Sequence, residues 1–257
     1  MTFYKYHGTG NDFVLIDDRE GTCVLSVAQV AALCHRRYGI GADGLMLLRR
    51  EAGYDFRMVY FNADGSESTM CGNGGRCMVA FARQLGIVGD TANFIAIDGS
   101  HTASVHADGL ISLQMKDVRD MDIQDGYTVL DTGSPHRVVW VKDAAATDVV
   151  ATGRAIRNYA EYQPGGINVN FTQFLGDHLY VRTYERGVED ETLSCGTGVT
   201  AAAIAATCRS TGAFDTRVLT PGGELQVSFM KTAPESATGV VLTGPAVMVY
   251  KGEIDGI

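Results

Sequence analysis

Two short glycine-rich stretches each contain a cysteine in a position suited to acid–base chemistry. They read 70-MCGNGGRC-77 and 194-SCGTG-198, and an apolar segment with helical spacing follows each. Cys71 and Cys195 are therefore predicted to lie just before the first turn of a helix, where backbone N–H groups and the helix dipole favour an anion. Such a position makes a thiol more acidic than its reference pKa of about 8.5. The glycines leave room for a ligand, and their N–H groups can bind a carboxylate.

The two stretches belong to an internal repeat. Cys195 lies 124 residues after Cys71. The same shift aligns four further pairs of identical residues: Tyr60 with Tyr184, Glu67 with Glu191, Gly72 with Gly196, and Gly74 with Gly198. Each copy reads strand, acidic loop, Cys-Gly-x-Gly and apolar helix, so we predict a duplication that produces two similar domains.

Two equivalent thiols on similar domains fit a two-base inversion at one carbon. A thiolate removes a proton from one face while a thiol delivers a proton to the opposite face. If the carbon is the α-carbon of an amino acid, N–H groups of Gly72–Asn73 and Gly196–Thr197 would hold its carboxylate and stabilise the developing charge. We expect chemistry without a cofactor, because pyridoxal phosphate needs a Schiff-base lysine. None of the lysines lies in a glycine-rich context: Lys5, Lys116, Lys142, Lys231 and Lys251.

Other kinds of site fit the sequence less well. The segment 39-GIGADG-44 matches a dinucleotide fingerprint literally, but a helix precedes it and a strand follows it, which is the reverse of the required order. We expect a turn there. Cys71 and Cys77 lie six residues apart, unlike the closely spaced cysteines of zinc knuckles, so no metal site is expected. A cysteine hydrolase and a non-catalytic amino-acid-binding protein remain as alternatives of a different class.

The surrounding pattern predicts a mixed α/β fold, with a mixed or antiparallel sheet wrapped around a central helix in each half. The helices at 72–85 and 197–209 are apolar nearly all round, which is typical of buried helices. We predict an N-terminal domain over 1–117, to which a last strand at 246–257 can return, and a C-terminal domain over 118–245. Further helices are expected at 26–37, capped by Ser26, and at 147–161. Strands are expected at 11–17, 45–48, 55–61, 93–115, 137–142, 167–175, 179–184, 216–219, 224–230 and 239–250.

The acidic composition of the chain argues against some classes of binding partner. The formal net charge is −9, and no long run of Lys and Arg occurs, so we expect neither nucleic acid nor an anionic membrane as a partner. No stretch approaches the length of a membrane-spanning helix, and the start of the chain does not resemble a signal peptide. We expect a cytoplasmic protein with reduced cysteines. Four cysteines outside the repeat are expected to be small buried hydrophobes: Cys23, Cys34, Cys77 and Cys208.

These stretches resemble the diaminopimelate epimerase family, whose members interconvert LL- and meso-diaminopimelate without pyridoxal phosphate. The matching motifs span nearly the whole chain: 7-HGTGNDFVLID-17, 39-GIGADGL-45, 61-FNADGSES-68, 70-MCGNGGRC-77, 133-GSPH-136, 168-NVNF-171, 185-ERG-187, 194-SCGTG-198 and 245-PAVMVYKGEI-254. Related proline racemases usually carry His where this chain has Asn73. Many family members carry Gln at the position of Gly44 and Asn at the position of Ser134.

The resemblance implies roles for individual residues. Cys71 and Cys195 would be the acid–base pair, supported by His136 and Glu185. The residues implied in binding the distal end of the substrate are Asn11, Asn62, Asn168 and Arg186, with Glu185 also near the substrate. The residues implied in binding the reacting carboxylate are Gly72, Asn73, Gly196 and Thr197. The resemblance further implies a site in the cleft between two domains, a homodimer, and a product used in lysine and peptidoglycan synthesis. A racemase for another amino acid is the nearest alternative.

Overall fold

The computed structural model describes residues 1–255, which form two compact units. The first unit comprises Met1–Leu113 and the segment from Gly244 onward, and the second comprises Gln114–Thr243. The predicted domain boundaries at 117/118 and 245/246 stay predictions. The helices are α1 (Val27–Cys34), α2 (Gly72–Gln84), α3 (Val149–Arg157) and α4 (Gly196–Ala206), with a 3₁₀ turn at Ala160–Tyr162. Within the described part of the chain, no helix is long and apolar enough to cross a membrane.

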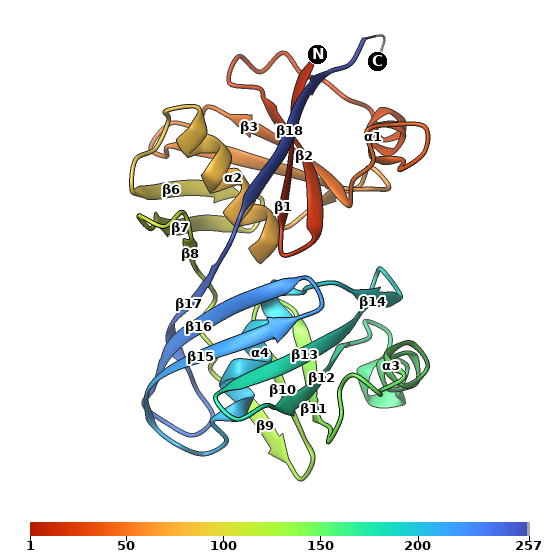
Figure 1. Cartoon of the computed structure of the whole chain (residues 1–257), viewed down its shortest axis with the longest axis vertical. Coiled ribbons are helices and arrows are strands. Elements are labelled where there is room, and N and C mark those ends of the chain that lie inside the picture. Colours follow the sequence, from red (N-terminus) through yellow and green to blue (C-terminus); the bar gives the residue numbers. More distant parts are fainter. Residues whose placement is uncertain (256–257) are drawn as a thin grey trace. The chain divides into compact units, whose positions relative to one another are not determined.

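The first unit is a mixed sheet around α2 (Figure 1). Its strands are β1 (Thr2–Gly8), β2 (Asn11–Asp17), β3 (Gly44–Arg49), β4 (Phe56–Asn62), β5 (Glu67–Ser68), β6 (Thr91–Ala96), β7 (Gly99–Val105), β8 (Ile111–Gln114) and β18 (Val247–Glu253). They pair in the order β18-β1-β2-β3-β4-β6-β7-β8, and β5 also pairs with β4. The β2–β3 and β4–β6 pairs are parallel, and the others are antiparallel.

The second unit repeats this plan around α4 (Figure 1). Its strands are β9 (Met121–Gln124), β10 (Tyr127–Asp131), β11 (Pro135–Trp140), β12 (Asn168–Phe174), β13 (His178–Glu185), β14 (Asp190–Thr192), β15 (Gly212–Thr220), β16 (Gly223–Lys231) and β17 (Thr238–Gly244). They pair in the order β9-β10-β11-β12-β13-β15-β16-β17, and β14 also pairs with β13. The parallel pairs β11–β12 and β13–β15 occupy the same places as β2–β3 and β4–β6.

The matching order supports the duplication. A shift of 124 residues moves the first residues of β2, β3 and α2 onto those of β11, β12 and α4. The predicted fold class is confirmed: each unit is a mixed α/β structure in which a sheet surrounds one buried helix. The apolar residues of both helices explain their position, because a helix without a polar face must be covered on all sides.

Local sequence signals set the ends of several helices. Ser26 caps α1 through a capping box, in which its hydroxyl accepts the N–H of Gln29 and the Gln29 side chain accepts the N–H of Ser26. The predicted end of α2 at Gly86 is confirmed, because this glycine has a φ of 71° and its N–H donates to the carbonyl of Arg83.

Some predicted boundaries are wrong. The strand expected at 239–250 is interrupted at Pro245, which has no N–H to donate to a sheet: β17 ends at Gly244 and β18 begins at Val247. The helix expected at 147–161 ends at Arg157, and only a 3₁₀ turn follows. The sequence does not predict β9 and β10, because strands of four and five residues carry little alternation, or β1, in which polar and aromatic residues interrupt the alternation.

Candidate active site

Cys71 occupies the N-cap of α2. Its backbone is extended, with φ −108° and ψ 148°, and its carbonyl accepts the N–H of Gly75 at 2.8 Å. The N–H of Gly74 donates to Cys71 Sγ at 3.2 Å. The sulfur therefore takes the place that a serine or aspartate oxygen takes in a usual N-cap, where a hydrogen-bond acceptor with negative charge is stabilised.

A chain of amide contacts runs from this helix to β2. Arg76 Nη2 donates to Asn73 Oδ1 at 2.9 Å, and Asn73 Nδ2 lies 3.4 Å from Asn11 Oδ1. Asn11 Nδ2 in turn donates to Asp43 Oδ2 at 2.7 Å. Both ends of the Asn11 amide are engaged, so the orientation of this predicted substrate-binding side chain is fixed by its neighbours.

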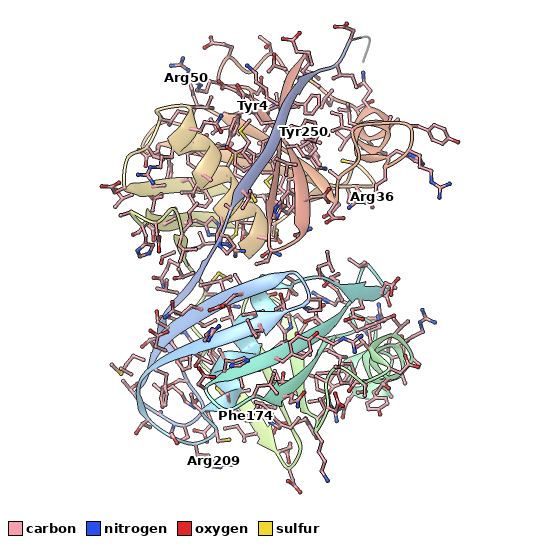
Figure 2. The ribbon with its side chains drawn as sticks, in the orientation of Figure 1. Tyr4, Arg36, Arg50, Phe174, Arg209 and Tyr250 are labelled. Atoms are coloured by element: carbon pink, nitrogen blue, oxygen red, sulfur yellow. The ribbon has the colours of Figure 1, made fainter. Side chains whose placement is uncertain are left out.

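Asp43 is itself held by a charged cluster. Arg36, labelled in Figure 2, donates to Asp43 Oδ1 and to Asp12 Oδ1, each at 2.7 Å, and Lys5 forms a 2.7 Å ion pair with Asp12. Burial raises the pKa of Asp12, but hydrogen bonds from Arg36 and Lys5 outweigh that effect and hold the pKa well below its usual range. These contacts connect β1, β2 and the segment between α1 and β3 around Asn11.

Asn62 closes a turn at the end of β4. Its N–H donates to the carbonyl of Ser66 at 2.9 Å, and its side chain lies 3.3 Å from Ser66 Oγ. Gly44 is the residue of β3 opposite Asn62. A side chain at Gly44 would meet the ring of Tyr60 at 2.5 Å and the carbonyl of Phe61 at 2.6 Å. The glycine in this chain is therefore required by the packing of β3 against β4.

The segment 39–43 links α1 to β3, so a helix precedes it and a strand follows it, as the sequence predicts. Gly41 has a φ of 80°, and the Gly39 N–H donates to the carbonyl of His35.

Cys195 occupies the equivalent N-cap of α4, with φ −114° and ψ 111°. Its Sγ lies 3.4 Å from Thr197 Oγ1, and either atom can donate. Thr197 Oγ1 is also 2.9 Å from His136 Nε2. Thr197 therefore connects the sulfur to the imidazole, and its hydroxyl can serve the sulfur both as thiol and as thiolate.

The tautomer of His136 follows from its second ring nitrogen. Asn170 Nδ2, which can only donate, lies 3.0 Å from His136 Nδ1, so Nδ1 accepts and Nε2 carries the proton. Thr183 Oγ1 donates to Asn170 Oδ1 at 2.9 Å and so sets the orientation of the amide. Burial lowers the pKa of His136 to about 3, which keeps the ring neutral at physiological pH. The imidazole is then a fixed donor toward Thr197.

The other predicted residues of the second unit lie at the start of β12 and the end of β13. Asn168 Oδ1 accepts the backbone N–H of Arg186 at 3.0 Å, and Asn168 Nδ2 donates to the carbonyl of Pro135 at 3.2 Å. Arg186 Nη1 donates to the carbonyl of Gly165 at 3.1 Å. Glu185 is the half-buried last residue of β13. These contacts hold Arg186 close to the residue that precedes His136.

The structure corrects part of the prediction for the remaining cysteines. Cys34 and Cys77 are buried, as expected, and burial raises the pKa of both thiols. Cys23 is only half-buried, and Cys208 is exposed. Cys208 follows the end of α4 with a φ of 49°, so its side chain lies outside the core that covers the helix.

The sequence alone does not identify several residues around the site. Arg76 lies in the second turn of α2 and is fully buried inside the first unit. Asn170 had a detectable signal, because it lies two residues after Asn168 on one strand and such residues share a face. Asp43 had none, since its partner Asn11 is distant in sequence.

The diaminopimelate epimerase family model matches residues 3–120 and 128–249. A diaminopimelate epimerase of Flavobacterium psychrophilum is 48% identical over 259 residues, covering 99% of this chain and 100% of the relative. One of Chlorobaculum tepidum is 44% identical over 260 residues, covering 96% of this chain and 98% of the relative.

Solved structures with low sequence identity share the fold. A phenazine biosynthesis protein of the PhzF family from Bacillus anthracis has a TM-score of 0.76 at 15% identity, covering 99% of this chain and 98% of the other. A hydroxyproline epimerase from Agrobacterium vitis has a TM-score of 0.71 at 14% identity, covering 98% and 91%.

Proposed function

Because the chain belongs to the diaminopimelate epimerase family, we propose that Cys71 and Cys195 are the base and the acid of its reaction. The family's reaction interconverts LL- and meso-diaminopimelate in lysine biosynthesis, so the protein is an isomerase. The single observation that carries the proposed mechanism is the pair of cysteines at equivalent N-caps of two buried helices.

The proposed step moves one proton off the substrate and one proton onto it. The thiolate takes the α-proton, and the electron pair of the C–H bond is left on the α-carbon. The opposite thiol then donates its proton to the other face of that carbon and becomes the thiolate. The net charge is unchanged, the configuration is inverted, and neither a redox partner nor a cofactor is needed.

The carbanion requires stabilisation, because an α-proton is far less acidic than a thiol. We assign this task to the first-turn N–H groups of Gly72 and Asn73 in α2 and of Gly196 and Thr197 in α4. These groups point out of their helices toward an acceptor, and they act without reorganisation when the carboxylate becomes more negative. The extended backbone of both N-cap cysteines supports this proposal, because it leaves the N–H groups of each first turn without a helical acceptor.

We assign supporting roles to the other predicted residues. His136 orients the Thr197 hydroxyl beside Cys195 and stays neutral while the proton moves. Glu185 acts near the reacting centre. The distal amino-acid end would be bound by Asn11, Asn62, Asn168 and Arg186.

Replacing either cysteine by alanine tests the mechanism. We expect Cys71→Ala and Cys195→Ala each to lower the epimerisation rate by at least about 100- to 10,000-fold, the usual contribution of a positioned acid or base. Epimerisation of diaminopimelate and deuterium incorporation from heavy water are measured together. The exposed Cys208→Ala is the matched control and should keep its activity. A Cys71→Ala Cys195→Ala double variant that still inverts the α-carbon contradicts the mechanism.

The same deuterium assay distinguishes substrates. Diaminopimelate should exchange its α-proton much faster than proline, hydroxyproline or histidine. Faster exchange with one of those amino acids would favour a racemase of that type instead.

We also propose a homodimer in the cytoplasm. The last strand, β18, exposes four successive apolar side chains, Val247–Tyr250, which would be covered by a second copy. Tyr250 is labelled in Figure 2. A cytoplasmic location fits chemistry that needs reduced thiols.

Light scattering on a Val249→Glu variant tests the dimer. The wild-type protein should have twice the mass of one chain, and the added charge on the exposed face of β18 should yield the mass of one chain. Lys251→Glu, on the same strand, is the control for a charge change alone. A wild-type mass equal to that of one chain contradicts the proposal.

A further inference from the structure

Arg76 is a fully buried guanidinium directly below the first turn of α2. Its Nη1 donates to the carbonyl of Gly72 at 3.1 Å and its Nη2 donates to Asn73 Oδ1 at 2.9 Å. Nη2 also donates to Thr9 Oγ1 at 3.4 Å, and Nε donates to the carbonyl of Pro245 at 3.3 Å. Four uncharged oxygens thus surround a buried positive charge.

The contact with Gly72 acts on the peptide group that ends in the N–H of Asn73. A hydrogen bond from a cation to a peptide carbonyl polarises that peptide and makes its N–H a stronger donor. This N–H is one of the groups assigned to the substrate carboxylate. Arg76 therefore holds the first turn of α2 in place and makes the Asn73 N–H a stronger donor to an anion.

The charge of Arg76 lacks a carboxylate counterion within the first 255 residues, where no acidic group forms an ion pair with it. Burial lowers the pKa of Arg76 to about 10, so the group stays protonated at neutral pH. The side chains whose charge interacts with it are the thiols of Cys77 and Cys71. Burial raises the pKa of Cys77, which therefore stays a neutral thiol.

Two carboxylates elsewhere in this unit have partners of their own. Asp12 forms ion pairs with Lys5 and Arg36. Asp98, which accepts the N–H of Met70 at 3.2 Å, lies 3.3 Å from His101. Of the two thiols that Arg76 faces, Cys71 is thus the one in a position to supply the negative charge.

The equivalent position in the second unit holds a neutral side chain. A shift of 124 residues places Arg76 on Thr200, and Thr200 Oγ1 donates to the carbonyl of Gly196 at 2.9 Å. The same carbonyl of the first helical residue is therefore held by a guanidinium in α2 and by a hydroxyl in α4.

The contact of Cys195 Sγ with Thr197 Oγ1 is with an uncharged group. The sulfur contacts the Thr197 hydroxyl, behind which lies the neutral ring of His136. Asp131 and Arg186 act on His136 with opposite electrostatic effects, and Asp131 is paired with Lys116 at 3.2 Å.

We propose that Arg76 is a positioning residue that keeps the negative charge of the thiol pair on Cys71 in the substrate-free enzyme. Cys71 is then the base and Cys195 the acid at the start of a turnover. After one turnover Cys71 carries the proton and Cys195 is the thiolate. Arg76 then favours transfer of the negative charge back to Cys71. The inference rests on the proposed two-thiol function.

Alkylation of the wild-type protein tests the assignment directly. The substrate-free enzyme is treated with iodoacetamide over a range of pH, and labelling of each cysteine is followed by peptide mapping. The thiolate is the reactive form, so the pH midpoint of labelling reports where each thiolate forms. We expect the midpoint of Cys71 to lie at least about one pH unit below that of Cys195, a tenfold difference in thiolate fraction. Equal midpoints, or a lower midpoint for Cys195, overturn the proposal.

Substitution of Arg76 separates its charge from its packing. In Arg76→Met the midpoint of Cys71 should rise by about one unit or more, because an adjacent cation is lost. Arg76→Lys keeps the charge and should retain most of the difference, although it loses contacts. Thr200→Val removes the equivalent neutral contact and should leave the Cys71 midpoint unchanged. A Cys71 midpoint that is the same in all three variants overturns the proposal, and if Arg76→Met does not fold, Arg76→Lys and the wild type decide.

The two proposals fail in different ways. Loss of epimerisation in both single cysteine variants, with a lower midpoint at Cys195, would leave the two-thiol mechanism intact and refute the role of Arg76. Undiminished exchange in the double cysteine variant would refute the mechanism itself.

Discussion

At the scale of single residues, the neutral state of His136 sets what it can do. Its ring is buried, Asn170 donates to one nitrogen, and the other nitrogen faces Thr197. With a pKa of about 3, the imidazole is neutral near neutral pH. The residue is better suited to hold a hydroxyl in place than to carry the substrate's proton.

The buried state of His136 predicts a pH dependence of stability. Its pKa is about 6.5 when unfolded and about 3 when folded, so the unfolded chain binds the proton more tightly. The contribution of neutral His136 to the free energy of unfolding is fully present above pH 6.5 and is lost as the pH falls from 6.5 toward 3. Melting temperatures between pH 7 and 4 should fall less steeply in His136→Gln than in the wild type. His106→Gln, at an exposed histidine, should retain the wild-type slope, and equal slopes in all three proteins would contradict the prediction.

At the scale of elements, glycines allow the central helices to approach their sheets. A Cβ at Gly198 in α4 would lie 2.2 Å from Asn170 Oδ1. The close approach of α4 to β12 is what lets Asn170 and Thr197 contact opposite sides of the same imidazole. The second glycine of the Cys-Gly-x-Gly motif is therefore explained by packing, in addition to room for a ligand.

This packing predicts the effect of Gly198→Ala. The added methyl group must displace Asn170, which should destabilise the fold by about 1–3 kcal/mol and misplace His136. We expect epimerase activity to fall about tenfold or more at temperatures where the variant remains folded, since misplaced supporting groups weaken catalysis. Gly89→Ala is the matched control, because a Cβ there meets nothing within 4 Å. A fully active and stable Gly198→Ala variant would show that the contact is not required.

At the scale of the whole molecule, the end of the chain completes the first unit. β18 pairs with β1 through six residues, from Thr2 opposite Glu253 to His7 opposite Val247. Arg76 also donates to the carbonyl of Pro245, just before this strand. The first unit consequently contains both the earliest and the latest described parts of the chain (Figure 1).

Truncation tests how far the first unit depends on this strand. A chain that ends at Gly244 loses the β1–β18 pairing and one acceptor of the buried Arg76. We expect it to melt at least about 5 °C lower, or not to fold, because several backbone hydrogen bonds and a charged contact are lost together. A chain that ends at Ile254 keeps the strand and serves as the control. Equal melting temperatures for the two truncated chains would contradict this dependence.

The sequence by itself determined the repeat, the two buried helices and the cysteines at their N-termini. These features depend on residues close together in the chain, such as the glycines after Cys71 and the apolar run after Cys195, and local spacing records them directly. The family motifs added the remaining candidate residues. The unpredicted strand β10 shows the limit, because its short alternation carries little signal before it is paired.

Only the tertiary structure decided which side chains surround each sulfur and with what charge. Asn170 behind His136 and the return of β18 to β1 join residues that are distant in the chain. The burial of Arg76 depends on β1, α2 and Pro245 at once, so no local pattern could distinguish it from a surface arginine. The contrast between Arg76 and Thr200 makes the two halves electrostatically unequal, because the free energy of a charge depends on its burial and its neighbours, which folding alone defines.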